Sequence, residues 1–351
     1  MKILKNMIPA AAKAYIRLGA SRTKYRKRIA AMSSAAEPFD ILIGTALHTN
    51  LGDHLIALAE KEFIPERSGR ALIEIPREAY HLYRNKISGI ALPEDTTVYI
   101  TGGGWMGDLW PNEEKDVQDM ASLFRKQKIV ILPQTIFYEN PESRLINRGN
   151  KIYAKCTEIK LCVREQSSYD RAEASLHIKN ISLTPDIALL YTYRSNRTPR
   201  SMCAGICLRR DREQVLDAAT ESKLLETVRN AGYKTVLVST MSDHRISEEE
   251  RKAAVNKALD EFASCSLLIV DRLHAMVFAY LTGRPCIALD NKTGKVSGVY
   301  RKWLYDCPYI MLADSTTKSE DIAAFIAQTK GISYQPKNFT SYFNEIIPKG
   351  E

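Results

Sequence analysis

The sequence predicts an α/β protein built from two doubly wound, Rossmann-like domains. Short apolar runs alternate with longer amphipathic stretches from residue 40 onward, the polar, proline-containing segment 193–202 interrupts this alternation, and the alternation then restarts. Such a pattern is typical of parallel strands joined by right-handed helical crossovers. Ligands of this fold bind beyond the carboxyl ends of the strands, so we expect a site in a cleft between the two domains.

The expected elements follow from the apolar runs in order. In the first half, buried strands are expected at 40–45, 97–101, 128–132, 159–164 and 181–184, with helices at 112–126 and 143–157. In the second half, strands are expected at 203–209, 234–240, 266–270 and 285–290, with helices within 212–231 and at 247–263, 272–282 and 318–329. The predicted parts are a basic arm (1–37), an N-terminal domain (38–195), a C-terminal domain (196–335) and a tail (336–351).

Composition narrows the class of protein. The chain has 351 residues, of which 45% are hydrophobic and 26% charged, as in a soluble globular protein. It contains no secretory signal and no apolar run of the roughly 18 residues that span a bilayer, so we expect a cytoplasmic protein. The seven cysteines lack the spacing of a zinc site, and we expect neither a metal nor a cofactor.

The net charge of +9 is concentrated in the N-terminal arm. Residues 1–36 contain nine lysines and arginines and no acid, so the rest of the chain is neutral, which argues against nucleic-acid binding. The cations of the arm are interleaved with apolar residues such as Ile3, Ile8 and Tyr15. Two interpretations remain open: a helix packed on the body, or a segment that lies on an anionic membrane face.

Polar groups follow the strands of the N-terminal half. Asn50, Gly52 and Asp53 form a strand-to-helix turn whose backbone can approach a ligand. Gly102, Gly103 and Gly104 come directly after an apolar run; a tight turn needs one glycine, so three favour close contact with a ligand.

Two further strand ends carry weaker signals. Gln134 follows the third expected strand, and Arg164 and Glu165 follow the fourth. The simpler interpretation of Arg164 and Glu165 is a local ion pair, with Ser167 or Ser168 capping the next helix. We nevertheless include all three residues in the expected cleft.

The C-terminal half places cations where strands end. Arg209 and Arg210 follow its first strand, and Arg272 and His274 open the helix after the third. Cations are disfavoured at a helix N-terminus, so their presence there indicates that an anion binds between them. Two arginines beside a helix N-terminus form a site for a compact dianion. Alternatively, Asp271 caps the helix and pairs with Arg272, leaving His274 structural; we favour the anion site.

These motifs, in this order, resemble the polysaccharide pyruvyl transferase family. The resemblance covers about residues 40–305 and is carried by NLGD, GGGWMGDLW, PQT, VREQSSYD, PD, CLRRD and DRLHA…GRPCIALDNKTGKVSG. It implies a glycosyltransferase-B-like pair of domains that transfers pyruvate from phosphoenolpyruvate to a sugar of an exopolysaccharide or capsule repeat, usually as a ketal, with release of phosphate. The donor-binding residues that it implies are Arg272, Leu273, His274, Lys295 and either Arg209 or Arg210.

The roles of the individual residues are hypotheses at this point. His274 is a candidate acid that protonates the enol methylene, and Asp53 is a candidate base for the acceptor hydroxyl. The N-terminal half is expected to hold the sugar, with Trp105 or Trp110 as a stacking surface. The resemblance also implies a lipid-linked acceptor at the inner membrane face, which would give the basic arm a purpose.

Two other functions stay open. A glycosyltransferase of the same fold would use a nucleotide sugar, and many such enzymes hold the donor ribose with a carboxylate on the helix corresponding to 272–282. That helix contains no acid, which counts against this alternative. A non-catalytic scaffold in polysaccharide assembly would not need both Arg272 and His274.

Overall fold

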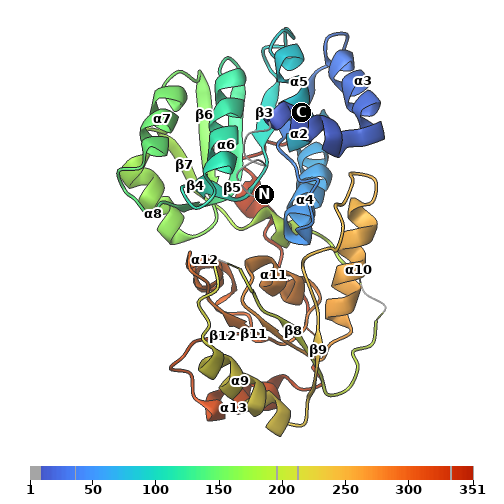
Figure 1. Ribbon diagram of the computed structural model, residues 1–351, viewed down its shortest axis with the longest axis vertical. Coiled ribbons are helices and arrows are strands. Elements are labelled where there is room, and N and C mark those ends of the chain that lie inside the picture. The colour runs from blue at the N-terminus through green and yellow to red at the C-terminus, as the bar shows by residue number, and fades with distance from the viewer. Residues whose placement is uncertain (1–8, 36, 195–196, 212, 333, 351) are drawn as a thin grey trace.

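A computed structural model of the chain describes residues 9–35, 37–194, 197–211, 213–332 and 334–350. Two parallel sheets, each flanked by helices, form two domains, one above the other (Figure 1). The N-terminal sheet has the order β2-β1-β3-β5-β6-β7, with β4 beside β5. Its elements are β1 (Phe39–Ile43), α4 (Leu51–Ser68), β2 (Ala71–Ile75), α5 (Arg77–Ile87), β3 (Thr97–Ile100), β4 (Gly103–Gly107), α6 (Pro111–Leu123), β5 (Lys128–Phe137), α7 (Arg144–Tyr153), β6 (Glu158–Val163), α8 (Gln166–Ser175) and β7 (Asn180–Leu183).

The C-terminal sheet has the order β12-β11-β10-β8-β9. Neighbouring strands of both sheets run parallel, so the predicted class of two Rossmann-like domains is confirmed. The elements of this domain are β8 (Cys203–Cys207), α9 (Ala218–Asn230), β9 (Lys234–Leu237), α10 (Arg251–Ala263), β10 (Leu267–Val270), α11 (Leu273–Leu281), β11 (Cys286–Leu289), α12 (Lys295–Val299), β12 (Ile310–Ala313) and α13 (Ser319–Thr329). The exact domain boundaries stay a prediction.

The expected strand end at Gln134 is wrong. Strand β5 continues through Pro133 to Phe137, with a register shift against β6 between Ile131 and Gln134. The glycine run is likewise not a loop, because β4 begins at Gly103 and pairs with the second half of β5. A strand containing proline and a strand rich in glycine both depart from the usual composition, which is why the apolar pattern did not reveal them.

Besides β4, two more strands, β2 and β12, were missed. Strand β2 contains Glu74, whose charge interrupts the apolar run; in the fold its buried carboxylate pairs with Arg251 at 2.7 Å. Helix α5, which follows β2, was missed with it. Strand β12 is the short run Ile310–Ala313 at the edge of the C-terminal sheet.

The two domains share an apolar contact on one side of the cleft. Helix α4 of the N-terminal domain packs on α10 of the C-terminal domain, and their side chains belong to one hydrophobic cluster that includes Leu55, Leu259 and Phe262. Burial of this surface fixes the relative position of the domains. This packing holds the start of α4, with Asn50 and Asp53, at the cleft between the domains.

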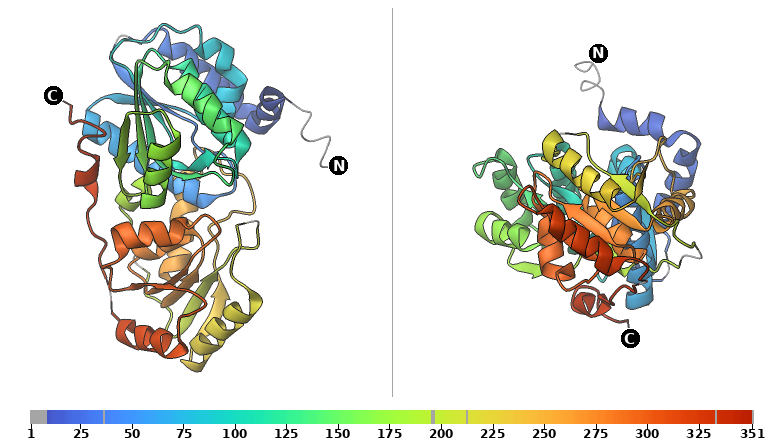
Figure 2. Two further views of the ribbon diagram at one scale, coloured as in Figure 1. Left: turned by 90° about the vertical axis from the view of Figure 1, so that its left-hand side faces the viewer. Right: turned by 90° about the horizontal axis from the view of Figure 1, so that it is seen from below.

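The N-terminal arm packs on the body. Its helices α2 (Ala10–Leu18) and α3 (Arg22–Met32) contact α5, and Tyr25, Ile29 and Met32 enter the core (Figure 2). Residues 1–8 lie outside the described residues. The end of the tail returns to the N-terminal domain, where Gly350 donates its N–H to the carbonyl of Arg67 at 3.0 Å.

Candidate functional site

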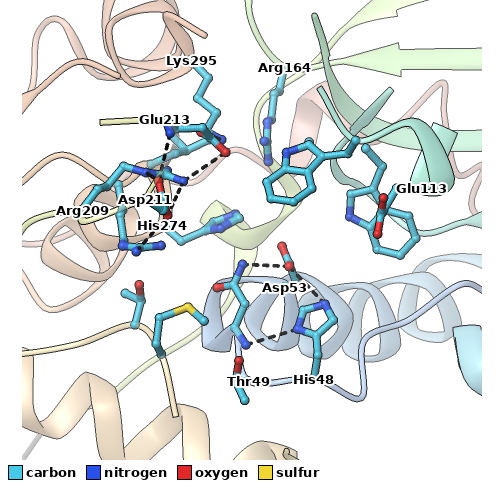
Figure 3. A pocket seen from close by; sticks show the side chains of 18 of the residues that line it. His48, Thr49, Asp53, Glu113, Arg164, Arg209, Asp211, Glu213, His274 and Lys295 are labelled. Atoms are coloured by element: carbon cyan, nitrogen blue, oxygen red, sulfur yellow. Dashed lines mark hydrogen bonds and ion pairs between the residues drawn. The ribbon is translucent and has the colours of Figure 1, made fainter. Parts of the chain in front are cut away.

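A cavity of about 420 Å³ lies where the carboxyl ends of the two sheets face each other (Figure 3). Side chains from both domains line it, as the fold predicts. The predicted site residues that line it are Asn50, Asp53, Gly104, Arg164, Arg209, Arg272, Leu273, His274 and Lys295.

Helix α11 points its N-terminus at the cavity. It follows the fully buried strand β10, and apart from His274 each of its residues is buried, so packing on both sides fixes its direction. Its N-cap residue Arg272 makes no capping hydrogen bond through its side chain. The first N–H groups of the helix therefore remain available to an anion.

Asp271 does not cap this helix. Its two carboxylate oxygens accept the backbone N–H of Arg209 at 2.8 and 3.0 Å, which ties the end of β8 to the end of β10. Burial raises the pKa of Asp271 to about 6, although the N–H of Arg209 works in the opposite direction. The capping alternative for Asp271 is thus wrong, and its carboxyl group instead holds the turn that carries Arg209.

Three cations share two carboxylates on the C-terminal side. Arg209 binds Asp211 in a bidentate manner at 2.9 and 3.0 Å and contacts Glu213 at 3.0 Å. Lys295 pairs with Glu213 at 2.8 Å, and Arg272 reaches Asp211 at 3.3 Å. Burial and the charges of neighbouring arginines lower the pKa of Lys295, against the effect of Glu213. The cluster keeps a surplus of positive charge.

The structure distinguishes the two adjacent arginines. Arg209 is buried and lines the cavity, whereas Arg210 is exposed and pairs with Glu221 at 2.6 Å, away from the cavity. The two side chains follow β8 in the same turn but point in different directions, so only Arg209 faces the cleft.

His274 meets Asp186 across the domain boundary. Its Nε2 lies 3.4 Å from Oδ2 of Asp186, and the same Oδ2 accepts Nη1 of Arg164 at 2.6 Å. Burial opposes ionisation of Asp186, but the charges of Arg164 and His274 outweigh it and hold the pKa of this carboxyl well below its usual range. The carboxylate is therefore ionised and orients the imidazole.

Gly52 provides the space for His274. A Cβ at position 52 would lie 2.3 Å from Nδ1 of His274, so only glycine allows the first turn of α4 to approach the ring. Gly52 does not line the cavity itself. Gly52 was predicted to contact a ligand, but it instead contacts His274, which lines the cavity.

Asp53 is held by two donors on one oxygen. Its Oδ2 accepts Nδ2 of Asn50 at 2.8 Å and lies 3.4 Å from Nε2 of His48. Nδ1 of His48 accepts the backbone N–H of Asn50 at 3.2 Å, so in the neutral ring Nε2 carries the proton that faces Asp53. The other oxygen of Asp53 points into the cavity (Figure 3).

The part of the chain that contains most of the cavity residues matches a known protein family. Residues 50–293, well over half of the chain, match the polysaccharide pyruvyl transferase family. The chain belongs to this family. Membership places it among enzymes that transfer pyruvyl groups to polysaccharide.

Several proteins are similar to this chain over most of its length, and one of them is named as a pyruvyl transferase. Pyruvyl transferase 1 of Schizosaccharomyces pombe is 28% identical over 282 residues, covering 76% of this chain and 70% of the relative. General stress protein 30 of Bacillus subtilis is 30% identical over 284 residues, covering 80% and 82%. An uncharacterized protein of Klebsiella pneumoniae has a similar fold, with a TM-score of 0.54, 19% identity and coverage of 84% and 99%.

The remaining predicted site residues of this chain do not line the cavity. Gln134 is buried, accepting the N–H of Trp105 and donating to the carbonyl of Thr101. Glu165 is buried and accepts the hydroxyls of Ser168 and Thr135. Their expected place in the cleft is wrong: β5 continues past Gln134 in the sheet interior, and Glu165 is a buried residue at the start of α8.

The glycine run is explained mainly by packing of the backbone. A Cβ on Gly102 would lie 2.9 Å from the carbonyl oxygen of Pro133, and Gly103 has a φ of +145° against the ring of Trp105. Gly104 alone of the three lines the cavity, where its Cα lies beside the guanidinium of Arg164. The prediction of a ligand loop therefore fails for Gly102 and Gly103.

Sequence reasoning missed His48, Asp186 and Arg77. Arg77 lines the cavity, stacks over Trp105 with its guanidinium carbon 5.8 Å from the ring centre, and pairs with Glu113 at 2.9 Å. It opens the unpredicted helix α5, so its place at a strand end was hidden. Asp186 comes three residues after the end of β7, and extending the strand-end rule to the fifth expected strand would have found it.

Two negative findings concern the described part of the chain. Within it, no group of three or more histidine, cysteine or acidic side chains is arranged to hold a metal ion. Among its helices, none is both long and apolar enough to cross a membrane.

Proposed function

We propose that the protein transfers pyruvate from phosphoenolpyruvate to two hydroxyls of a saccharide, forming a ketal and releasing phosphate. The observation that carries this proposal is the convergence of Arg209, Arg272 and Lys295 on the uncapped N-terminus of α11. Phosphoenolpyruvate is small and carries a carboxylate and a phosphate. Bidentate guanidinium groups and free helix N–H groups suit both anions.

Arg164 supports the donor site from the opposite domain. Its Nε and Nη1 are bound to Thr135 and Asp186, at 2.9 and 2.6 Å. Its Nη2 lies beside Gly104, close to the ammonium group of Lys295. A donor held by the C-terminal cluster would thus meet a fourth cation from the N-terminal domain.

His274 is the proposed acid. The carboxylate of Asp186 at 3.4 Å stabilises a positive charge on the imidazole. Proton transfer to the methylene carbon makes the neighbouring carbon electrophilic, and a saccharide hydroxyl then attacks it. The carbon–oxygen bond to phosphate breaks as the second hydroxyl closes the ketal. One hydroxyl proton finishes on the new methyl group, and the other leaves with phosphate.

Asp53 is the proposed base. Asn50 and His48 hold one of its oxygens, which leaves the other free to accept the proton of the attacking hydroxyl. The saccharide would lie on the N-terminal side, between Asp53 and the aromatic residues Trp105 and Trp110. The Arg77–Glu113 pair offers it both donors and acceptors there.

A pair of adjacent variants tests this proposal. Protein is incubated with isotope-labelled phosphoenolpyruvate and a saccharide fraction from its own cells, and both saccharide label and free phosphate are measured. We expect equal amounts of each, loss of at least 90% of the rate in Arg209→Ala, and a nearly unchanged rate in Arg210→Ala. Equal rates in the two variants would show that the cluster around Arg209 does not bind the donor.

A further inference from the structure

Helix α2 exposes an apolar stripe. Ala12, Tyr15 and Ile16 lie at helical spacing on its outer face, and Tyr15 and Ile16 are 54% and 74% exposed. Ala14 and Leu18 on the opposite face are buried against the body. Figure 2 shows α2 standing out from the side of the N-terminal domain.

The charges around this stripe are all positive. Residues 9–35 contain seven lysines and arginines and no acid. Lys24 and Arg28 are used internally, because both pair with Glu248 of the C-terminal domain at 2.9 Å. Lys13, Arg26 and Lys27 form no ion pair with any described residue, and Arg22 lies over the ring of Tyr15 at 3.7 Å. Lys13 thus lies on α2 itself and Arg22 against Tyr15, while Arg26 and Lys27 lie on the next helix, α3.

We propose that this face of α2, with the cations beside it, docks on an anionic lipid surface. An exposed aromatic and a branched aliphatic side chain insert into the headgroup region, while lysines and arginines meet lipid phosphates. A second copy of this chain fits less well, because a symmetric contact would bring the same cations together. The structure also narrows the docking segment: α3 is largely committed to the body through Lys24 and Arg28.

Docking at α2 would place the cavity near the lipid surface. Arg17 of α2 lies 4.0 Å from Glu78 on the first turn of α5, and the preceding residue, Arg77, lines the cavity. Helix α5 therefore contacts the docking helix α2 and also contributes Arg77 to the acceptor side of the cavity. The proposal concerns α2 alone and holds whichever donor the cavity binds.

The test is co-sedimentation of the full chain with vesicles of phosphatidylcholine containing 30% phosphatidylglycerol, compared with phosphatidylcholine alone. The variant is Tyr15→Ser/Ile16→Ser, and the control is Leu237→Ser, which removes an 89% exposed apolar side chain from strand β9. We expect binding to the anionic vesicles only, weakened at least tenfold by the double variant, weakened by salt and unchanged by the control.

Three results would overturn the proposal. One is equal binding by the double variant and the full chain. Another is equal binding to neutral and anionic vesicles. The third is concentration-dependent self-association in sedimentation velocity that the double variant abolishes, which would assign the stripe to a second copy. A separate titration of phosphoenolpyruvate into the double variant shows whether the cavity is intact.

Discussion

Nε2 of His274 lies 3.4 Å from Oδ2 of Asp186, so an imidazole of the C-terminal domain meets a carboxylate of the N-terminal domain across the cleft. Neither domain alone contains this pair. The proposed acid is therefore oriented only when the two domains are packed as they are here, through α4, α10 and their apolar contact.

The approach of Gly52 to His274 predicts a variant that folds but turns over slowly. Gly52→Ala places a Cβ 2.3 Å from Nδ1 of His274 and displaces the ring from Asp186, while alanine suits the helix backbone better than glycine does. We expect kcat to fall about 100-fold, since a general acid contributes roughly 10²- to 10⁴-fold. Gly89→Ala, where a Cβ meets no closer atom than 3.6 Å, is the control. A normal kcat in Gly52→Ala would exclude His274 as the acid.

The contacts of Asp53 predict a graded effect of two substitutions. Asp53→Asn removes the proposed base, so we expect kcat to fall about 10²- to 10⁴-fold with little change in phosphoenolpyruvate affinity. His48→Gln keeps the hydrogen bond from Asn50 to Asp53 but removes the contact of His48 with the same oxygen, so kcat should fall about tenfold. His177→Gln, at an exposed position, serves as the control. An unaltered kcat in His48→Gln would show that His48 does not act through Asp53.

Buried Glu60 predicts a dependence of stability on pH. Its carboxyl group accepts the N–H of Gly102 and contacts the hydroxyl of Thr101, both at 2.7 Å, and burial raises its pKa to about 8. An unfolded glutamate titrates near 4.3, so between about pH 4.3 and 8 the folded state binds more protons and stability falls as pH rises.

Glu60→Gln should remove this loss. A glutamine can accept from Gly102 and donate to Thr101, as a protonated carboxyl group does. We expect thermal unfolding at pH 8.5 to show the variant about 1–3 kcal/mol more stable than the natural chain, with a much smaller difference at pH 5. Glu62→Gln on the same helix, where the carboxylate is exposed, is the control. The same difference at both pH values would mean that Glu60 is ionised throughout.

Glu248 joins the arm to both domains. It pairs with Lys24 and Arg28 of α3 at 2.9 Å and with Lys61 of α4 at 3.1 Å. Although burial opposes ionisation, these cations hold the pKa of Glu248 below its usual range, so its contribution to stability is present above about pH 4.3 and lost at lower pH. Glu248→Gln should reduce the free energy of unfolding at pH 7 by about 1–3 kcal/mol.

The neighbouring Glu249 provides the comparison for this variant. It is 58% exposed and pairs with Lys24 alone. Urea titration of both variants at pH 7 measures the difference, and Glu249→Gln should change the free energy of unfolding by less than about 0.5 kcal/mol. Equal effects of the two substitutions would show that the arm is not held through Glu248.

Much of the site could be predicted because the fold gathers strand ends at one edge. Arg209, Arg272, His274, Asn50 and Asp53 were all identified as polar residues that follow an apolar run, and all line the cavity. This inference needs only the alternation of strand and helix, which burial makes visible in the sequence.

What the sequence did not reveal depends on packing between distant segments. Gly102 suggested a ligand loop, but it lies against Pro133 of the neighbouring strand β5. The partnership of Asp186 with His274 joins residues 88 positions apart in different domains. Arg209 and Arg210 are chemically identical in sequence, and only the direction of the side chain at the end of β8 separates them.

The central claim, that the N-terminus of α11 and its cations bind phosphoenolpyruvate, is tested most directly by calorimetric titration of phosphoenolpyruvate into the full chain. Arg272→Ala and Arg210→Ala are titrated alongside, with nucleotide sugars as competing ligands. We predict binding at one site per chain, weakened at least tenfold in Arg272→Ala and unchanged in Arg210→Ala. Binding of a nucleotide sugar without binding of phosphoenolpyruvate would contradict the claim and indicate a glycosyltransferase.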